Sequence, residues 1–232
     1  MFGLPTHLQN TDDVELKQIM QRVVMLQNGI VASQMAKSGV RGLMNYGVTL
    51  PDLRRIASET GTNHALARRL CQLNIREARI LASMLFDANQ LTNEDFTLIY
   101  NSITNIDMAE SFAQNIVCKI ADCNFYNRLV DGDKWHVVAA MHAVGWCVAQ
   151  HRQHTEILSE WFIGSLELIV NKNIAETAQP IIATMTAISD IAETNKQAIA
   201  KLAEKLATSA MPFAQNIGNQ HKQMYSEDFQ EP

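Results

Sequence analysis

The chain has 232 residues, of which 47% are hydrophobic, 19% are charged and 6% are aromatic. Its 19 Lys and Arg residues against 24 Asp and Glu residues give a formal net charge of −5. The apolar content excludes an intrinsically disordered chain, and the length suits one large domain or two small ones. The acidic balance argues against a strong generic nucleic-acid-binding protein, whose surface is ordinarily basic.

Apolar residues recur at helical spacing through most of the chain, and glycine and proline are few, at 10 and 5 residues. This pattern is typical of an all-α protein. The Thr92-x-x-Asp95 spacing resembles a capping box and marks the start of one helix. In chain order, the expected helices cover residues 14–26, 30–37, 51–59, 63–72, 75–85, 92–102, 108–121, 134–150, 156–170, 173–189 and 194–210.

Pairs of these helices recur about every 35–40 residues, as in HEAT or armadillo repeats. The pattern therefore predicts a HEAT/armadillo-like α-α superhelix, one domain over residues 12–210, and a globular helical bundle is the alternative. Residues 1–11 and 213–232 are expected to be flexible termini. Pro180 is expected to kink the helix at 173–189, because proline removes a backbone hydrogen bond.

Several features bear on location and cofactors. Four cysteines in a chain of this length make no disulfide framework, so we expect reduced thiols and a cytoplasmic protein. No apolar run approaches the ~20 residues that span a bilayer, so no membrane contact is expected. Cys147, His151 and His154 share one helical face and could bind zinc, but a buried cysteine near a polar helix end is the preferred interpretation. We expect no metal and no cofactor.

His142 and Trp146 are four residues apart, which places their aromatic rings one helical turn from each other. The two side chains could face a pocket, or they could lie at the edge of an amphipathic core.

The negative charge is unevenly distributed. Residues 41–79 carry seven arginines against three acids, a net charge of +4, whereas residues 80–232 carry nine basic and eighteen acidic residues, a net charge of −9. The planar fork of arginine suits phosphate, although arginines on a solvated face also pair with neighbouring acids. The candidate nucleic-acid contacts are Arg41, Arg54, Arg55, Arg68 and Arg69.

Residues 40–86 carry a more specific signal, which continues weakly to about residue 190. The segments concerned are Tyr46-Gly47-Val48, Pro51-Asp52-Leu53-Arg54-Arg55-Ile56-Ala57 and Ile75-Arg76-Glu77-Ala78-Arg79-Ile80-Leu81-Ala82-Ser83. They resemble the HEAT-like DNA alkylation-repair family, the AlkD-type DNA glycosylases. The resemblance implies a curved solenoid of helix pairs that excises cationic alkylpurines from DNA in a basic concave groove, without a cofactor.

The resemblance also implies a tryptophan four residues before a catalytic aspartate, on a helix that follows the arginine-rich segment. Our best alignment places Ile106 and Glu110 at these positions, and a shift by three residues places Ile103 and Asp107 there. A carboxylate suits the charge that develops on the sugar as the glycosidic bond breaks. Acids at a helix N-terminus, which favour the helix dipole, are the alternative interpretation of Asp107 and Glu110.

Other positions implied by the resemblance carry different side chains. An arginine of the family falls at Val138, and a later tryptophan falls near residues 179–184, where no aromatic residue occurs. We therefore expect a divergent member that binds nucleic acid or a partner on its concave face, with glycosylase activity lost or altered. An active alkylpurine DNA glycosylase that uses Glu110 or Asp107 is one alternative. A scaffold that binds proteins or peptides and is unrelated to DNA is the other.

Overall fold

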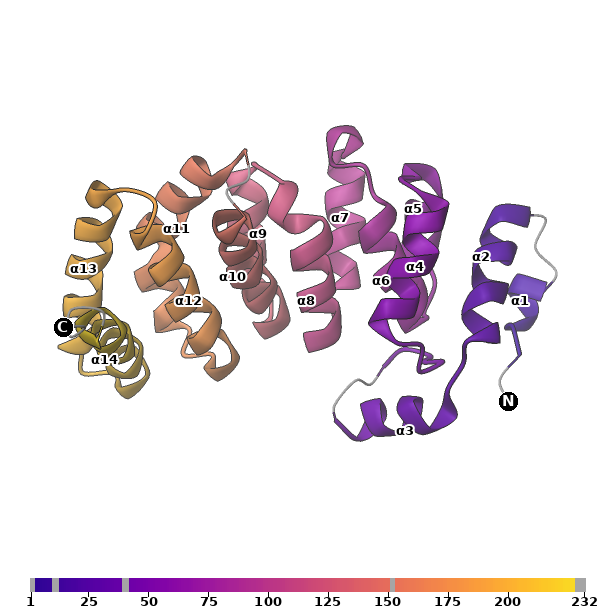
Figure 1. Ribbon diagram of the computed structural model, residues 1–232, viewed down its shortest axis with the longest axis horizontal. Coiled ribbons are helices and arrows are strands. Elements are labelled where there is room, and N and C mark those ends of the chain that lie inside the picture. Colours follow the sequence, from indigo (N-terminus) through magenta and orange to yellow (C-terminus); the bar gives the residue numbers. More distant parts are fainter. Residues whose placement is uncertain (1–2, 10–12, 39–41, 151–152, 228–232) are drawn as a thin grey trace. The chain divides into compact units, whose positions relative to one another are not determined.

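The computed structural model describes residues 3–9, 13–38, 42–150 and 153–227 (Figure 1). Its internal contacts divide the chain into two compact units, Met1–Ile116 (unit 1) and Val117–Pro232 (unit 2), where we expected one domain. Helices account for the secondary structure in both units, and within the described ranges the only β-bridge pairs Met44 with Ile75. None of the helices in those ranges is long and apolar enough to cross a bilayer.

Unit 1 contains eight α-helices among its described residues. They are α1 (Thr6–Gln9), α2 (Val14–Met25), α3 (Gly29–Lys37), α4 (Leu50–Thr60), α5 (His64–Cys71), α6 (Arg76–Leu85), α7 (Asn93–Ser102) and α8 (Ile106–Asn115), with a 3-10 turn, Ala88–Gln90, before α7. Short polar side chains begin most of them by accepting a backbone N–H, as Thr49 does for α4 and Asn105 for α8.

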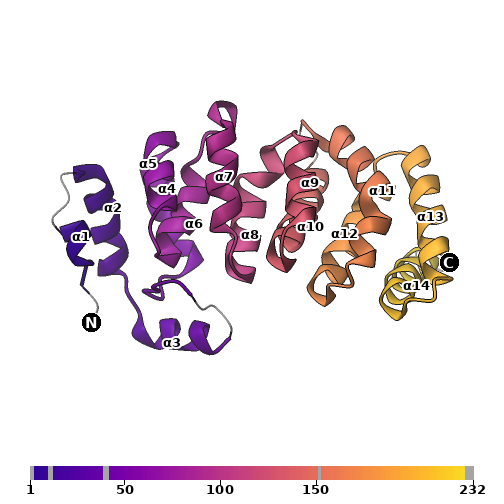
Figure 2. The same ribbon diagram turned by 180° about the vertical axis from the view of Figure 1, so that it is seen from behind.

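The helices α4, α6 and α8 lie side by side in unit 1, with α6 in the middle (Figures 1 and 2). Helix α5 packs on α6 and α7 and, with α2 and α7, belongs to a second layer. Arg76, the first residue of α6, donates hydrogen bonds to Val48 just before α4 and to Asp107 in the first turn of α8. At the other end, the last residues of α6 and α8 share one groove with Gly61 after α4. The three helices therefore run parallel, as equivalent helices of successive repeats do.

Unit 2 is built around α10, which is buried along most of its length. Its helices are α9 (Cys123–Asp131), α10 (Lys134–Ala149), α11 (Thr155–Asn171), α12 (Ala178–Ser189), α13 (Glu193–Ala207) and α14 (Pro212–Glu227), with 3-10 turns at Val117–Lys119 and Ala175–Thr177. Helix α10 contacts α9, α11 and α12. Lys134, the first residue of α10, pairs with Glu176 just before α12, so α10 and α12 begin at the same end.

The structure corrects the C-terminal expectation. The segment from residue 213 is not a flexible tail up to residue 227, because α14 packs on α13 and α12 and buries Ala214, Ile217 and His221. Gly218 permits this contact, since a Cβ on it would lie 2.4 Å from the backbone nitrogen of Ala207. Few residues of α14 are buried, and the many Gln and Asn residues between them concealed the apolar seam. At the other terminus, Leu8 of α1 is buried as well.

Other differences concern helix ends. Helix α9 was not predicted, and the expected helix at 108–121 is divided into α8 and a 3-10 turn. Pro180 lies in the first turn of α12, where no i−4 hydrogen bond is required, so the expected kink is wrong.

The capping box at the start of α7 supports a prediction about pH. The side chain of Asp95 accepts hydrogen bonds from the backbone N–H and hydroxyl of Thr92, at 2.9 and 2.7 Å. Burial by itself raises the pKa of Asp95, but these hydrogen bonds and the charges of Arg68 and His64 outweigh burial and lower the pKa below 3.8. Because the pKa is lowered in the folded state, this contribution to stability is present above pH 3.8 and is lost as the pH falls through the folded pKa.

We therefore expect Asp95→Asn to lower the free energy of unfolding by about 1 kcal/mol at pH 7, with a smaller difference from wild type at pH 3. Urea unfolding at the two pH values measures the difference. Glu94→Gln is the matched control, because Glu94 is an exposed neighbour whose surface pair with Arg68 contributes little. If Asp95→Asn lowered the free energy of unfolding by the same amount at both pH values, the stabilising role of the ionised Asp95 carboxylate would be contradicted.

Candidate functional site

A buried guanidinium joins the starts of α4, α6 and α8. Arg76 is 2% exposed, and its Nε and Nη2 donate to Oδ2 and Oδ1 of Asp107 at 2.5 and 3.3 Å. Its Nη1 donates to the carbonyl of Val48 at 3.1 Å and to Oε1 of Glu77 at 3.2 Å. Such bidentate contacts are the strong form of an arginine–carboxylate pair.

Glu77 completes this network from the interior. It is 0% exposed, and its two oxygens accept the backbone N–H groups of Tyr46 and Val48 at 3.1 and 3.2 Å. Gly47 between them has φ 73°, and a Cβ there would lie 2.1 Å from the carbonyl oxygen of Asn28. The segment before α4 is thus held against α6 by a buried carboxylate, at a position that accepts only glycine.

The two candidate carboxylates on α8 have different surroundings. Both oxygens of Asp107 are engaged by Arg76, so this residue already serves as a counter-ion. Glu110, one turn further on, is exposed, and no described residue makes a hydrogen bond or ion pair with its carboxylate. Partial desolvation, and then the charge of Asp107, raise the pKa of Glu110.

Most of the candidate arginines in the described ranges are paired with acids. Arg68 binds Glu94 at 2.6 Å and Asp95 at 3.4 Å. Arg69 binds Asp13 at 2.9 Å and Glu15 at 2.6 Å. Arg55 makes one exposed pair with Asp52, one turn earlier on α4, at 3.0 Å. The alternative interpretation from the sequence, a solvated face with ion pairs, thus describes all three.

Arg54 differs from these three arginines. It is exposed on α4 and has no acidic partner among the described residues. It borders a groove of about 380 Å³ at the C-terminal ends of α4, α6 and α8, lined also by Ala57, Ser58, Gly61, Thr62, Met84 and Asn115. Arg41 lies outside the described residues.

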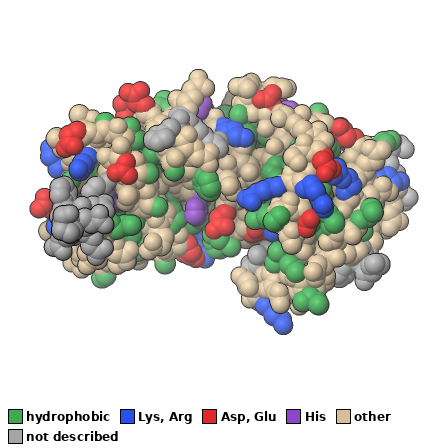
Figure 3. Space-filling view, in the orientation of Figure 1, with side chains coloured by type: hydrophobic (Ala, Val, Ile, Leu, Met, Phe, Trp, Pro, Cys, Tyr) green, Lys and Arg blue, Asp and Glu red, His purple; other side chains and the backbone are tan. Residues whose placement is uncertain are grey.

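The structure therefore does not gather the candidate arginines into one cluster. Arg54 and Arg55 lie on α4, whereas Arg68 and Arg69 lie on α5 in the other layer. In the space-filling view, basic side chains on the visible face of unit 1 alternate with acidic ones (Figure 3).

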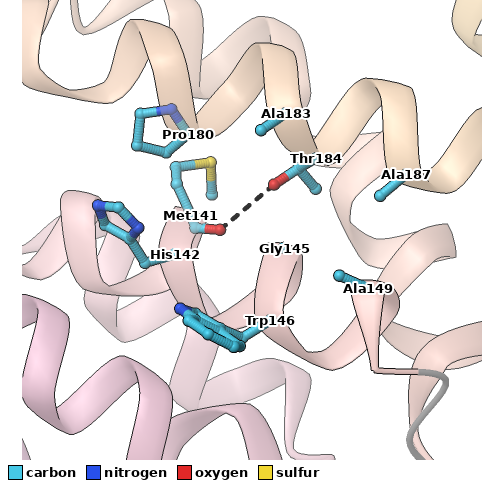
Figure 4. A pocket seen from close by; sticks show the side chains of 9 residues that line it. All are labelled: Met141, His142, Gly145, Trp146, Ala149, Pro180, Ala183, Thr184 and Ala187. Atoms are coloured by element: carbon cyan, nitrogen blue, oxygen red, sulfur yellow. Dashed lines mark hydrogen bonds between the residues drawn. The ribbon is translucent and has the colours of Figure 1, made fainter.

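Unit 2 contains a pocket, which is one of the two surroundings predicted for His142 and Trp146. His142 and Trp146 of α10 face it together with residues of α12, and its volume is about 240 Å³ (Figure 4). Cys147, by contrast, is buried, and His151 lies outside the described ranges. In those ranges no group of three or more His, Cys, Asp and Glu side chains could hold a metal ion.

Comparison with known proteins identifies the family. A family model described as "DNA alkylation repair enzyme" matches residues 6–220. The chain belongs to this family. The predicted family is thereby confirmed, and none of the curated proteins matches the chain.

A solved structure extends this result to the fold. It is described as "A new family of proteins related to the HEAT-like repeat DNA glycosylases with affinity for branched DNA structures". The likeness covers 90% of this chain and 94% of that one, with a TM-score of 0.67 and 12% sequence identity. It confirms the predicted all-α fold of HEAT-like helical repeats.

Within the DNA alkylation repair family, the geometry bears on the two alignments of the active site. Ile106 and Glu110 both lie on α8, one turn apart, whereas Ile103 is the C-cap residue after α7 and lies outside α8. A pair on one helix is what the family resemblance implies, so the structure favours the Ile106 and Glu110 alignment. Val138, which the sequence analysis aligned with an arginine of the family, is fully buried in α10.

The buried network predicts unequal roles for the two carboxylates. Asp107→Asn removes the charge that faces a guanidinium with almost no access to water, so we expect the free energy of unfolding to fall by about 3 kcal/mol. Glu110→Gln is the matched control on the same helix, and we expect no loss, since ionised Glu110 lies close to another negative charge. Urea unfolding at pH 7 measures both variants. Equal stability of the two variants would contradict a structural role for Asp107.

Proposed function

We propose that this chain binds DNA, with higher affinity for branched than for continuous duplexes, and that it does not excise bases. The observation that carries the proposal is the family match over residues 6–220. The affinity for branched DNA is a property described for the similar solved structure, and we extend it to this chain because the two share a fold over nearly their whole lengths.

The absence of excision is supported by the chemistry of the candidate site. Breaking an N-glycosidic bond places positive charge on the sugar, which aromatic faces and a positioned carboxylate stabilise. Ile106 offers no aromatic face, and Asp107 is already the counter-ion of Arg76. Val138 is aliphatic and buried, so it cannot hold a phosphate.

Arg54 is the strongest candidate for a phosphate contact. Its guanidinium has no acidic partner among the described residues, so binding a phosphate breaks no ion pair there. The groove beside it adds the hydroxyl of Thr62 and the amide of Asn115, which has one N–H left after donating the other to Ser83, whereas the hydroxyl of Ser58 donates to the carbonyl of Arg55. Arg55 has a single exposed partner, whose loss costs little, whereas Arg68 and Arg69 must each give up two carboxylates.

The salt dependence of DNA binding tests this proposal. We expect the affinity for a four-way junction to exceed that for a linear duplex of the same length, and both to fall steeply with salt. Arg54→Ala is expected to reduce the slope of log K against log salt by about 0.9, because one phosphate contact is lost. Arg68→Ala is the matched control and is expected to leave the slope unchanged. Fluorescence anisotropy with labelled DNA measures all three proteins.

Failure to bind DNA at low salt, or binding that salt does not weaken, would overturn the proposed function. If Arg54→Ala and Arg68→Ala reduced the slope of log K against log salt equally, the phosphate contact of Arg54 would be overturned, while the DNA-binding function would stand.

A second candidate function is base excision, which the surroundings of Glu110 favour. Its carboxylate is exposed, has no partner among the described residues, and has a raised pKa, as a group available to substrate would have. Incubation with a duplex that contains a cationic alkylpurine, followed by detection of the free base, tests this function. We expect no release from the wild-type protein. Release that Glu110→Gln abolishes would instead establish an excision enzyme.

A further inference from the structure

The pocket of unit 2 lies between two parallel helices, α10 and α12 (Figure 4). It is lined by Met141, His142, Gly145, Trp146, Ala149, Pro180, Ala183, Thr184 and Ala187. None of these side chains is acidic or permanently basic. The pocket is smaller than the roughly 300–1,000 Å³ of sites for drug-sized ligands, so its size suits one ring system.

Small side chains leave room for the pocket, and the bottom of the pocket lies where α10 and α12 approach each other closely. A Cβ on Gly145 would lie 2.8 Å from Oγ1 of Thr184, so a larger residue here would require the Thr184 side chain to move. The hydroxyl of Thr184 donates to the carbonyl of Met141 at 3.4 Å, a weak contact between the same two helices. On either side of this crossing, alanines at 149, 183 and 187 leave the groove open.

Two rings of α10 border the open part of the pocket. Trp146 is 36% exposed, which is high for a tryptophan in a unit with a large apolar core. Among the described residues, none hydrogen-bonds the ring nitrogens of Trp146 or His142. Burial lowers the pKa of His142 below 6.5, so at pH 7 its imidazole is neutral and offers one donor and one acceptor.

This combination selects a class of ligand. An exposed indole stacks on the flat face of any nucleobase, and a neutral imidazole can form a hydrogen bond with the polar edge of a heterocycle. The lining excludes anions, because no cation is present to hold them, and it excludes long flexible chains by its size. A nucleobase has a flat face and a polar edge, and its phosphates would remain outside the pocket.

We propose that this pocket binds one unpaired nucleobase, stacked against Trp146 with its polar edge toward His142. The inference rests on the proposed function, because DNA is the source of the base. It deepens that function, since branch points expose bases that continuous duplexes keep stacked. Branched DNA would then be selected by an unpaired base that enters the pocket of unit 2.

The test uses a duplex with one unpaired 2-aminopurine, the same duplex fully paired, and 2-aminopurine riboside alone. We expect the wild-type protein to bind the unpaired duplex about tenfold more tightly than the paired one, within the range measured for stacking of one base. Trp146→Ala and Ala183→Leu, which fills the pocket from an exposed position of α12, are expected to abolish this preference. Quenching of 2-aminopurine fluorescence reports the binding.

Two controls match these variants. Trp135→Ala removes an indole from the same helix that contacts Lys134 rather than the pocket, and Ala200→Leu adds the same bulk to an exposed position of α13. Both are expected to keep the tenfold preference. If Trp146→Ala keeps it as well, the pocket assignment is overturned while the DNA-binding function stands.

Failure of the proposed function gives a different result. If the wild-type protein binds no DNA, the riboside decides about the pocket. Saturable quenching that Trp146→Ala abolishes would support a nucleobase site without DNA binding, and no quenching by the wild-type protein would overturn the pocket as well.

Discussion

The guanidinium of Arg76 is the constraint on which unit 1 depends. A buried charge costs several kcal/mol unless it is paired and hydrogen-bonded, and here it has a bidentate carboxylate, a second carboxylate and a carbonyl. Its partners come from the segment before α4, from α6 and from α8. Satisfying one cation therefore fixes the starts of three parallel helices, and with them the positions of Arg54 and Glu110.

The same network explains why a strong family resemblance coexists with an altered site. Among the residues that carry the resemblance, those at 46–48 and 75–79 include Arg76, Glu77 and the glycine that allows this network, whereas those at 51–57 include Arg54, which borders the groove. The residues at 46–48 and 76–77 are architectural, because they hold helices together. Asp107 takes part in that architecture, and the exposed carboxylate one turn later is Glu110.

Charge in this protein is mostly neutralised locally. The arginine block at 41–79 is basic by count, yet Arg68 and Arg69 are each held by two acids from outside that block. In the proposed function, attraction to DNA depends on groups without an acidic partner among the described residues, such as Arg54, and discrimination between kinds of DNA depends on an uncharged feature. The pocket with Trp146 in unit 2 is such a feature, since stacking needs no charge.

The sequence by itself predicted most of the helices, the HEAT-like repeats and the family, because helical periodicity, caps and short motifs are local properties of the chain. It did not predict α9, nor α14, whose apolar seam is narrow and becomes evident only where it meets α13. Only the tertiary structure distinguished the role of Asp107 from that of Glu110, and the role of Arg54 from that of Arg68. Residues of the same type differ in the distant partners that they contact, and the sequence does not reveal those partners. Arg76 and Asp107 are 31 positions apart, and no local pattern records such a pair. For the same reason, the sequence named His142 and Trp146 as neighbours, but the approach of α12 at Gly145 decided that they border a pocket.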